Sequence, residues 1–163
     1  MNILKNEAPA AAEALVGKLL VRRFSDGREL RARITETEAY YTVADTACHA
    51  HRGRTRRTET LYGPAGTIYV YLCYGMHWML NLVTGAEGSP QAVLIRGVEG
   101  VSGPGRVTKY LGIDGGLNGA ALGEELRLEE DGYIPPAVER TARIGIGYAA
   151  PEDREKLWRF LAR

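Results

Sequence analysis

Five stretches of this chain carry the apolar, β-branched and aromatic residues, most of them in alternation, that half-buried β-strands require. These stretches are residues 19–24, 30–40, 67–74, 78–84 and 92–98. Short turn sequences separate two of the pairs: Ser25-Asp26-Gly27 lies in the first and Gly75-Met76-His77 in the second. Because connections this short join antiparallel neighbours, the chain is constrained to fold around an antiparallel sheet.

The remaining predicted elements are short and flank that sheet. We expect helices over residues 9–15, 106–111 and 153–161, and weaker strands over 126–128 and 143–146. No internal repeat or linker divides the chain, and 163 residues suffice to bury one core. The prediction is one α+β domain over residues 1–163, with a curved, largely antiparallel β-sheet core, a protruding β-hairpin and flanking short helices.

The composition is that of a folded protein, with 45% hydrophobic and 25% charged residues. Its apolar stretches are too short to span a membrane, and residues 1–7 lack the apolar core of a secretory signal. Cys48 and Cys73 form no CxxC pair. We therefore expect reduced thiols and a cytoplasmic protein without membrane association.

Local charge is more informative than the formal net charge of +1. Arginines occupy four of the six positions from Arg52 to Arg57, while acidic residues gather near 124–131 and in the C-terminal segment. A basic run of this kind is either a solvated loop or a phosphate-binding patch. The asymmetry would let a nearly neutral protein present one positive face.

The sequence Glu36-Thr-Glu38-Ala-Tyr40 ends the second predicted strand. Alternation places Glu36, Glu38 and Tyr40 on the same face as Leu30 and Ile34, so two carboxylates continue a core-facing row. A carboxylate there could act as a general base, its charge held by a nearby cation. The alternative is that both carboxylates lie at a sheet edge and face solvent.

Two further patterns have both a chemical and a structural interpretation. The sequence Cys48-His-Ala-His51 suggests zinc, but no second Cys/His pair completes a structural site; a histidine that stacks or hydrogen-bonds is the preferred interpretation, and we expect no metal. Tyr69 and Tyr71 share one face of a strand and Tyr74 follows at its turn. They are either core aromatics or a platform and wedge for nucleic-acid bases.

Taken together, these motifs resemble the alkyladenine DNA glycosylase family, also called the methylpurine or 3-methyladenine DNA glycosylase family. The resemblance runs in the family's order along nearly the whole chain. It is carried by residues 15–22, Ile34-Thr-Glu-Thr-Glu-Ala-Tyr40, 45–49, 52–55, Gly66-Thr-Ile-Tyr-Val-Tyr-Leu-Cys-Tyr-Gly-Met76, Asn81, 93–96, 103–105, 111–113, 117–119 and 143–146.

The resemblance implies roles for individual residues. Glu38 corresponds to the general base, and Arg96 to a cation that helps place the water and keeps Glu38 ionised. The walls of the base pocket and its selectivity gate correspond to Tyr40, His49, Tyr71 and Asn81.

Further residues are expected to contact the DNA. Tyr74 resembles the side chain that intercalates into the gap left by the extruded base. The other expected contacts are Tyr69, Arg52, Arg54, Arg57 and Arg106. Where the family usually has Arg-Thr-Pro-Arg-Asn, this chain has Arg54-Thr-Arg-Arg-Thr58.

The resemblance also implies the activity. A DNA repair glycosylase flips alkylated or deaminated purines out of duplex DNA and hydrolyses the N-glycosidic bond. No lysine matches a nucleophile position, so the expected enzyme is monofunctional, without AP lyase activity. We expect a monomer that needs no cofactor and binds double-stranded DNA containing a damaged purine. Two alternatives stay open: a metal-dependent nuclease or hydrolase built on Glu36, Glu38, His49 and His51, and a non-catalytic nucleic-acid-binding module that uses the tyrosine strand.

Overall fold

A 13-residue strand, β2 (Glu29–Tyr41), is the central element of the computed structural model, which describes residues 2–163. Strand β2 pairs with β1, β5 and β9, and every strand pair is antiparallel. The other strands are β1 (Leu19–Arg23), β3 (Ile68–Cys73), β4 (His77–Val83), β5 (Gln91–Val98), β6 (Val101–Ser102), β7 (Leu126–Glu129), β8 (Val138–Thr141) and β9 (Arg159–Ala162). The main path of the sheet is β3-β4-β5-β2-β1-β7. The α+β prediction with an antiparallel sheet is confirmed.

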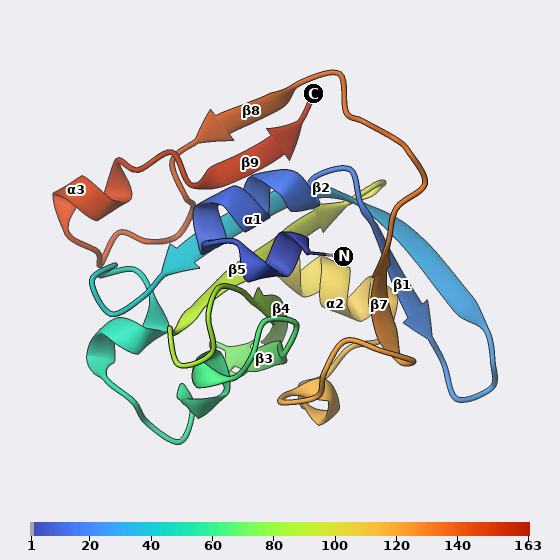
Figure 1. Ribbon diagram of the computed structural model, residues 1–163, viewed down its shortest axis with the longest axis horizontal. Coiled ribbons are helices and arrows are strands. Elements are labelled where there is room, and N and C mark those ends of the chain that lie inside the picture. The colour runs from blue at the N-terminus through green and yellow to red at the C-terminus, as the bar shows by residue number, and fades with distance from the viewer. Residues whose placement is uncertain (1) are drawn as a thin grey trace.

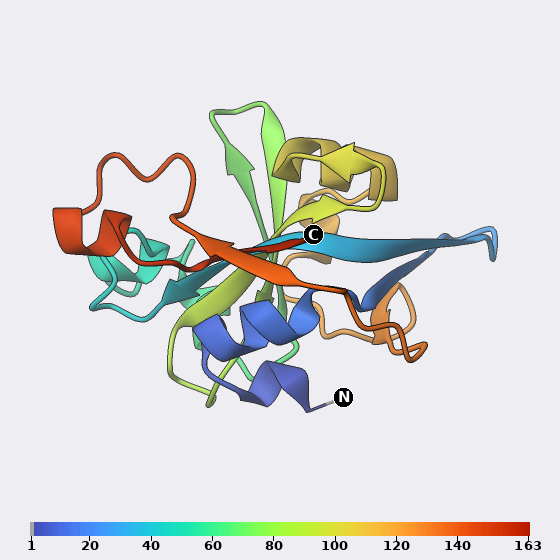
Figure 2. The ribbon, with the colours of Figure 1, turned by 90° about the horizontal axis from the view of Figure 1, so that it is seen from above.

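Short helices flank the sheet. The α-helices are α1 (Ala8–Leu15), α2 (Pro104–Leu111) and α3 (Pro151–Arg154), and the 3-10 helices are η1 (Ile3–Lys5), η2 (His49–Arg52), η3 (Glu59–Tyr62) and η4 (Gly115–Leu117). Helix α1 covers one side of β2 and β5 (Figure 1). Seen from above, the β3–β4 hairpin projects on the opposite side, and the β1–β2 hairpin extends sideways (Figure 2). No helix within residues 2–163 is both long and apolar enough to cross a membrane.

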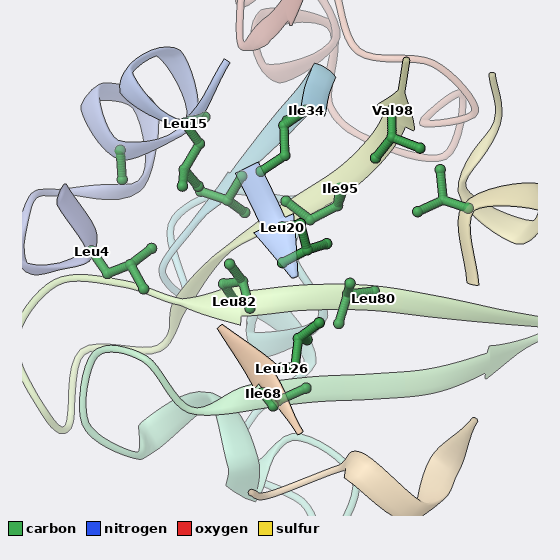
Figure 3. Close-up of a cluster of buried hydrophobic side chains, with 14 of the residues drawn as sticks. Leu4, Leu15, Leu20, Ile34, Ile68, Leu80, Leu82, Ile95, Val98 and Leu126 are labelled. Atoms are coloured by element: carbon green, nitrogen blue, oxygen red, sulfur yellow. The ribbon is translucent and has the colours of Figure 1, made fainter. Parts of the chain in front are cut away.

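The main core lies between α1 and the sheet. Leu15 of α1 packs with residues of β1, β2 and β5, among them Leu20, Ile34 and Ile95, all with no exposed surface (Figure 3). Apolar side chains repeating at a period of two on several strands bury one face of the sheet in this way. The other face of the C-terminal half of β2 is left to polar and aromatic side chains.

A β-bulge in β2 decides which side chains face the core. Ile34 pairs with Val98 on β5, Glu36 with Gly97 and Thr37 with Ile95, so the register shifts by one residue after Ile34 and returns before Thr37. After the shift, the Thr37 hydroxyl donates to the carbonyl of Ala12 in α1, and the two carboxylates face the other way. The predicted continuous row from Ile34 to Glu36 and Glu38 is therefore wrong, because the irregular pairing between Ile34 and Thr37 turns the later side chains to the face opposite to the one that strict alternation predicts.

Gly97 leaves room for this bulge. A Cβ at Gly97 would lie 3.1 Å from the Glu36 Cβ and 3.1 Å from the Thr35 hydroxyl oxygen. That is closer than ordinary van der Waals contact, so a side chain at this position would push the bulged residues aside.

Two C-terminal predictions are wrong. Residues 143–146 form no strand; the strand in this region is β8, and the Ile144 N–H donates to a carboxylate instead of a neighbouring strand. The helix predicted over 153–161 is the single turn α3 followed by β9. Phe160 is buried in the main core because β9 pairs with β2, so tertiary packing overrides local helix preference.

Candidate active site

A cleft of about 670 Å³ opens where β2, β3, β4 and β5 meet the irregular segments around residues 46–58 and 144–148. Ten of the twelve residues predicted for the site line it: Glu38, Tyr40, His49, Arg52, Arg57, Tyr69, Tyr71, Tyr74, Asn81 and Arg96. Arg54 and Arg106 are not part of the lining. The fold thus brings most of the predicted site together from segments that are distant in sequence.

Glu38 lies in the cleft wall with no exposed surface. Its Oε1 accepts a hydrogen bond from the Tyr40 hydroxyl at 3.0 Å, and its Oε2 accepts one from the Ile144 N–H at 2.6 Å. Burial raises the pKa of Glu38, while the Ile144 amide, Arg96 and Tyr40 oppose the rise by stabilising the carboxylate. The result is a carboxyl poised to take up a proton, as a general base must.

Arg96 is anchored mainly by the other carboxylate. Its Nε donates to Glu36 Oε1 at 2.9 Å, whereas its Nη1 lies 3.8 Å from Glu38 Oε1. Arg159 of β9 also donates to Glu36 Oε1, at 2.6 Å. The predicted effect of Arg96 on the charge of Glu38 is present in direction, but burial outweighs it and the net pKa shift of Glu38 is upward.

Aromatic rings form another wall of the cleft. The His49 ring lies edge-on to Tyr71, with 4.5 Å between centroids, and its Nδ1 is 3.0 Å from the Tyr69 hydroxyl. Burial, with the charges of Arg57 and Arg52, lowers the pKa of His49 to about 4. The imidazole is therefore neutral at neutral pH. Burial keeps the Tyr40 hydroxyl protonated by raising its pKa well above the ordinary value.

The amide of Asn81 has a fixed orientation within this lining. Its Nδ2 donates to the backbone carbonyls of Tyr69 and Met79, both at 3.3 Å. The side chain is buried and is part of the cleft lining.

The β3–β4 turn carries the most exposed aromatic ring of the cleft. Tyr74 is 92% exposed and has a φ of 52°, followed by Gly75 at 66°. The Met76 N–H closes the turn on the Cys73 carbonyl at 3.0 Å. Two successive left-handed residues favour Asn or Gly at the first position. A tyrosine there is strained, and such strain is typical of functional sites.

The basic residues divide into two groups. Arg52 and Arg57 line the cleft, and the Arg57 guanidinium lies 5.2 Å from the centroid of Tyr71. Arg54 instead forms two hydrogen bonds to Glu59, at 2.8 and 2.7 Å, outside the cleft. Thr58, where the related family usually has Asn, is buried, and its hydroxyl closes the loop on the Gly53 carbonyl at 2.9 Å.

The metal-site alternative is not supported over residues 2–163, where no three His, Cys, Asp or Glu side chains gather as ligands. His49 is engaged with Tyr69, and His51 Nδ1 is 2.7 Å from the Val43 carbonyl. Cys48 and Cys73 are free thiols.

Sequence reasoning missed Asp45, Arg143 and Arg159 as parts of the site's framework. All three act through tertiary contacts. Arg143 binds Asp45, which lies 98 positions away, and Arg159 binds Glu36, which lies 123 positions away. From the sequence alone, the run 143–146 is assigned only to a weak strand and to the family resemblance, without a role in the site. An arginine inside an otherwise apolar, glycine-containing run was the available signal.

This α+β fold and its ring-walled cleft with a buried acid define a chain of the DNA glycosylase class, and comparison with known proteins agrees. A family model described as "Methylpurine-DNA glycosylase (MPG)" matches residues 2–163. Proteins named "Putative 3-methyladenine DNA glycosylase" are similar: one from Borrelia garinii subsp. bavariensis is 44% identical, with 94% of this chain and 90% of that protein covered. One from Rickettsia rickettsii is 46% identical (90% and 80%), and one from Synechococcus elongatus 44% (88% and 78%). This chain belongs to the methylpurine-DNA glycosylase family.

Proposed function

We propose that this protein flips alkylated or deaminated purines out of duplex DNA and hydrolyses their N-glycosidic bond, leaving an abasic site. The single observation that carries the proposal is the position of Glu38. It is a carboxyl with no exposed surface in a cleft walled by His49, Tyr71 and Tyr40, within a chain of the methylpurine-DNA glycosylase family. The reaction belongs to base excision repair of alkylation damage.

The bond-breaking step needs one base and one nucleophile. Water attacks C1′ of the flipped nucleotide, Glu38 accepts the proton of that water, and the electron pair of the C1′–N bond leaves with the purine. The nearby carboxylate also stabilises the oxocarbenium-like transition state. Arg96, 3.8 Å from Glu38, is placed to orient the water and the nucleotide's backbone.

The cleft lining described within residues 2–163 includes no lysine. Strand cleavage by a glycosylase of the lyase type requires an amine that forms a Schiff base with C1′. The proposed enzyme is therefore monofunctional, without AP lyase activity.

The ring walls suit damaged purines. Methylation at a ring nitrogen leaves the purine cationic, and cation–π attraction in a desolvated site is worth about 2 kcal/mol. A neutral His49 ring adds no opposing charge, since its pKa is about 4. The proposed substrates are 3-methyladenine, 7-methylguanine, hypoxanthine and ethenoadenine. Asn81 would disfavour ordinary guanine by crowding its exocyclic amino group, a penalty that the cationic ring of 7-methylguanine offsets through cation–π attraction.

Flipping costs a few kcal/mol of lost stacking and pairing. Stacking in the cleft returns about 1–3 kcal/mol for a base, and Tyr74, exposed at the hairpin turn, would fill the gap in the duplex. The further proposed DNA contacts are Arg52, Arg54, Arg57 and Arg106, and also Tyr69, which is buried in the cleft wall and can reach only the flipped nucleotide. The proposed active species is a monomer bound to double-stranded DNA, in the cytoplasm at the nucleoid.

The test is release of free base from duplexes that each carry one of the four lesions, with strand scission scored separately. We expect release from at least one lesion and intact strands until the abasic site is cleaved by alkali. Salt-sensitive binding without release from any lesion would instead support a non-catalytic nucleic-acid-binding module. Scission without alkali would overturn the monofunctional assignment.

A further inference from the structure

Arg143 and Asp45 form a fully buried ion pair beside the cleft. Two guanidinium N–H groups meet the two carboxylate oxygens at 2.7 and 3.0 Å, and the side chains are 0% and 1% exposed. The same guanidinium donates to the carbonyls of Ala39, at 2.9 Å, and Asp153, at 3.1 Å. Burial opposes the charge, yet the bonds to Asp45 hold the pKa of Arg143 above its ordinary value.

This ion pair connects three segments of the chain. Asp45 also accepts the backbone N–H groups of Tyr41 at 2.9 Å and Ala47 at 3.1 Å, at the end of β2 and in the loop after it. Arg143 adds the segment that follows β8, and its bond to Asp153 adds α3. Because desolvation offsets most of the attraction in a buried ion pair, such a pair contributes more to geometry than to net stability.

The residue after Arg143 contacts the catalytic carboxyl. The Ile144 N–H donates to Glu38 Oε2 at 2.6 Å. Residues 142–146 belong to no strand or helix, and the Ile144 side chain is 45% exposed. Neither a sheet ladder nor packing of Ile144 fixes this N–H, so the buried side chain of Arg143 is its nearest anchor.

We propose that Arg143 and Asp45 are positioning residues that hold the Ile144 N–H on the carboxylate of Glu38. The inference rests on the proposed function, because Glu38 matters here as the base of the hydrolysis. Arg143 touches neither the water nor the substrate in this account; it acts through the backbone of its neighbour.

The surroundings of Glu38 support this role. Charged and titratable groups face it from every neighbouring element: Glu36 and Tyr40 on β2, Arg96 on β5, Arg159 on β9, and Arg143. Of the influences that lower the pKa of Glu38 against burial, the Ile144 amide is the largest, ahead of Arg96 and Tyr40. The Ile144 N–H also makes the shortest of these contacts to Glu38, at 2.6 Å against 3.0 Å for Tyr40 and 3.8 Å for Arg96, so its loss should leave the acid harder to ionise.

The experiment removes the donor and its anchor separately in the full-length protein. In one variant the α-hydroxy acid analogue of isoleucine replaces Ile144, which exchanges the N–H for an ester oxygen and keeps the side chain. Arg143→Met and the milder Asp45→Asn weaken the anchor. Arg33→Met is the control, since Arg33 also binds an aspartate, Asp131, with two N–H groups, and neither residue lines the cleft.

Two quantities are measured for each variant. The first is the titration of the Glu38 side-chain carboxyl by carbon NMR in the free protein, assigned with Glu38→Gln. The second is the pH dependence of base release under single-turnover conditions. In the ester variant and in the two anchor variants we expect the Glu38 carboxyl to titrate at higher pH than in the wild type. We also expect these variants to release base about tenfold more slowly below neutral pH. In Arg33→Met the titration of Glu38 should be unchanged.

An ester variant that titrates like the wild type would overturn the role of the amide. If Asp45→Asn and Arg143→Met fold and their Glu38 carboxyl titrates as in the wild type, the role of the anchor is overturned. If Arg143→Met does not fold, the result for Asp45→Asn decides. The titration needs no activity. If the wild type releases no base, the proposed function fails, while the NMR result still decides the positioning inference.

Discussion

At one end of the cleft Glu38 has no exposed surface, whereas at the β3–β4 turn the Tyr74 ring is 92% exposed. Glu38 is held by hydrogen bonds and charges from β2, β5 and the segment after β8. Tyr74 is held by one tight turn whose backbone is strained. The position of Glu38 therefore depends on contacts from several distant segments of the fold. The position of Tyr74 depends on one local turn, which can be changed with little effect on the core.

The largest expected effect on folding stability is the loss of stability at low pH caused by the buried end of the cleft. In the unfolded state His49 takes up a proton with a pKa of 6.5, whereas in the native state its pKa is about 4. Between these two pH values the unfolded state binds more protons than the native state, so the free energy of unfolding falls as the pH drops. The loss by pH 4 is on the order of 2–3 kcal/mol. His49→Gln should remove it, as measured by urea unfolding at pH 7 and pH 4.

The same substitution at exposed His77 controls for the loss of one histidine. An equal pH dependence in wild type and His49→Gln would mean that the ring is not buried in its neutral form.

A smaller effect is expected from the ring wall between the two ends. Tyr71→Ala removes the ring that contacts both His49 and Tyr69. Stacking is worth about 1–3 kcal/mol for a base, so single-turnover release should slow by about tenfold to a hundredfold. The control is Tyr133→Ala, since Tyr133 stacks on Arg33 outside the cleft. Unchanged release in Tyr71→Ala would remove the stacking role of this wall.

The smallest effect is expected at the hairpin. Tyr74→Asn places a residue that tolerates φ of 52° in the turn, so the free energy of unfolding should rise by about 1 kcal/mol. Affinity for lesion-containing duplex should fall by about tenfold, because the wedge is lost. Tyr74→Phe, which keeps both the ring and the strain, should change neither quantity much.

A Tyr74→Asn variant that is less stable than the wild type would show that the turn stores no strain. One that is more stable and binds as tightly would separate the ring from DNA binding.

The sequence predicted those parts of the molecule that depend on local patterns. The strands from β1 to β5 and the tyrosine face of β3 follow from the period of two and from turn residues such as Gly75. The ten cleft residues could be predicted because the family resemblance extends over the segments that carry them.

What could not be predicted depends on tertiary contacts. The bulge between Ile34 and Thr37 shifts the faces of β2 without any signal in the alternation itself. Strand β9 forms because it pairs with a free edge of β2 and because Phe160 is buried in the main core. The bond from Arg143 to Asp45 joins residues 98 positions apart, which no local pattern encodes.

The most direct test of the central claim compares Glu38→Gln with the wild type on one lesion-containing duplex, measuring single-turnover base release and binding affinity in parallel. Loss of a general base costs about 10²–10⁴-fold in rate, so release should fall by about a thousandfold or more while affinity changes by less than about threefold. Release near the wild-type rate, or parallel loss of release and binding, would contradict a catalytic role for this buried acid.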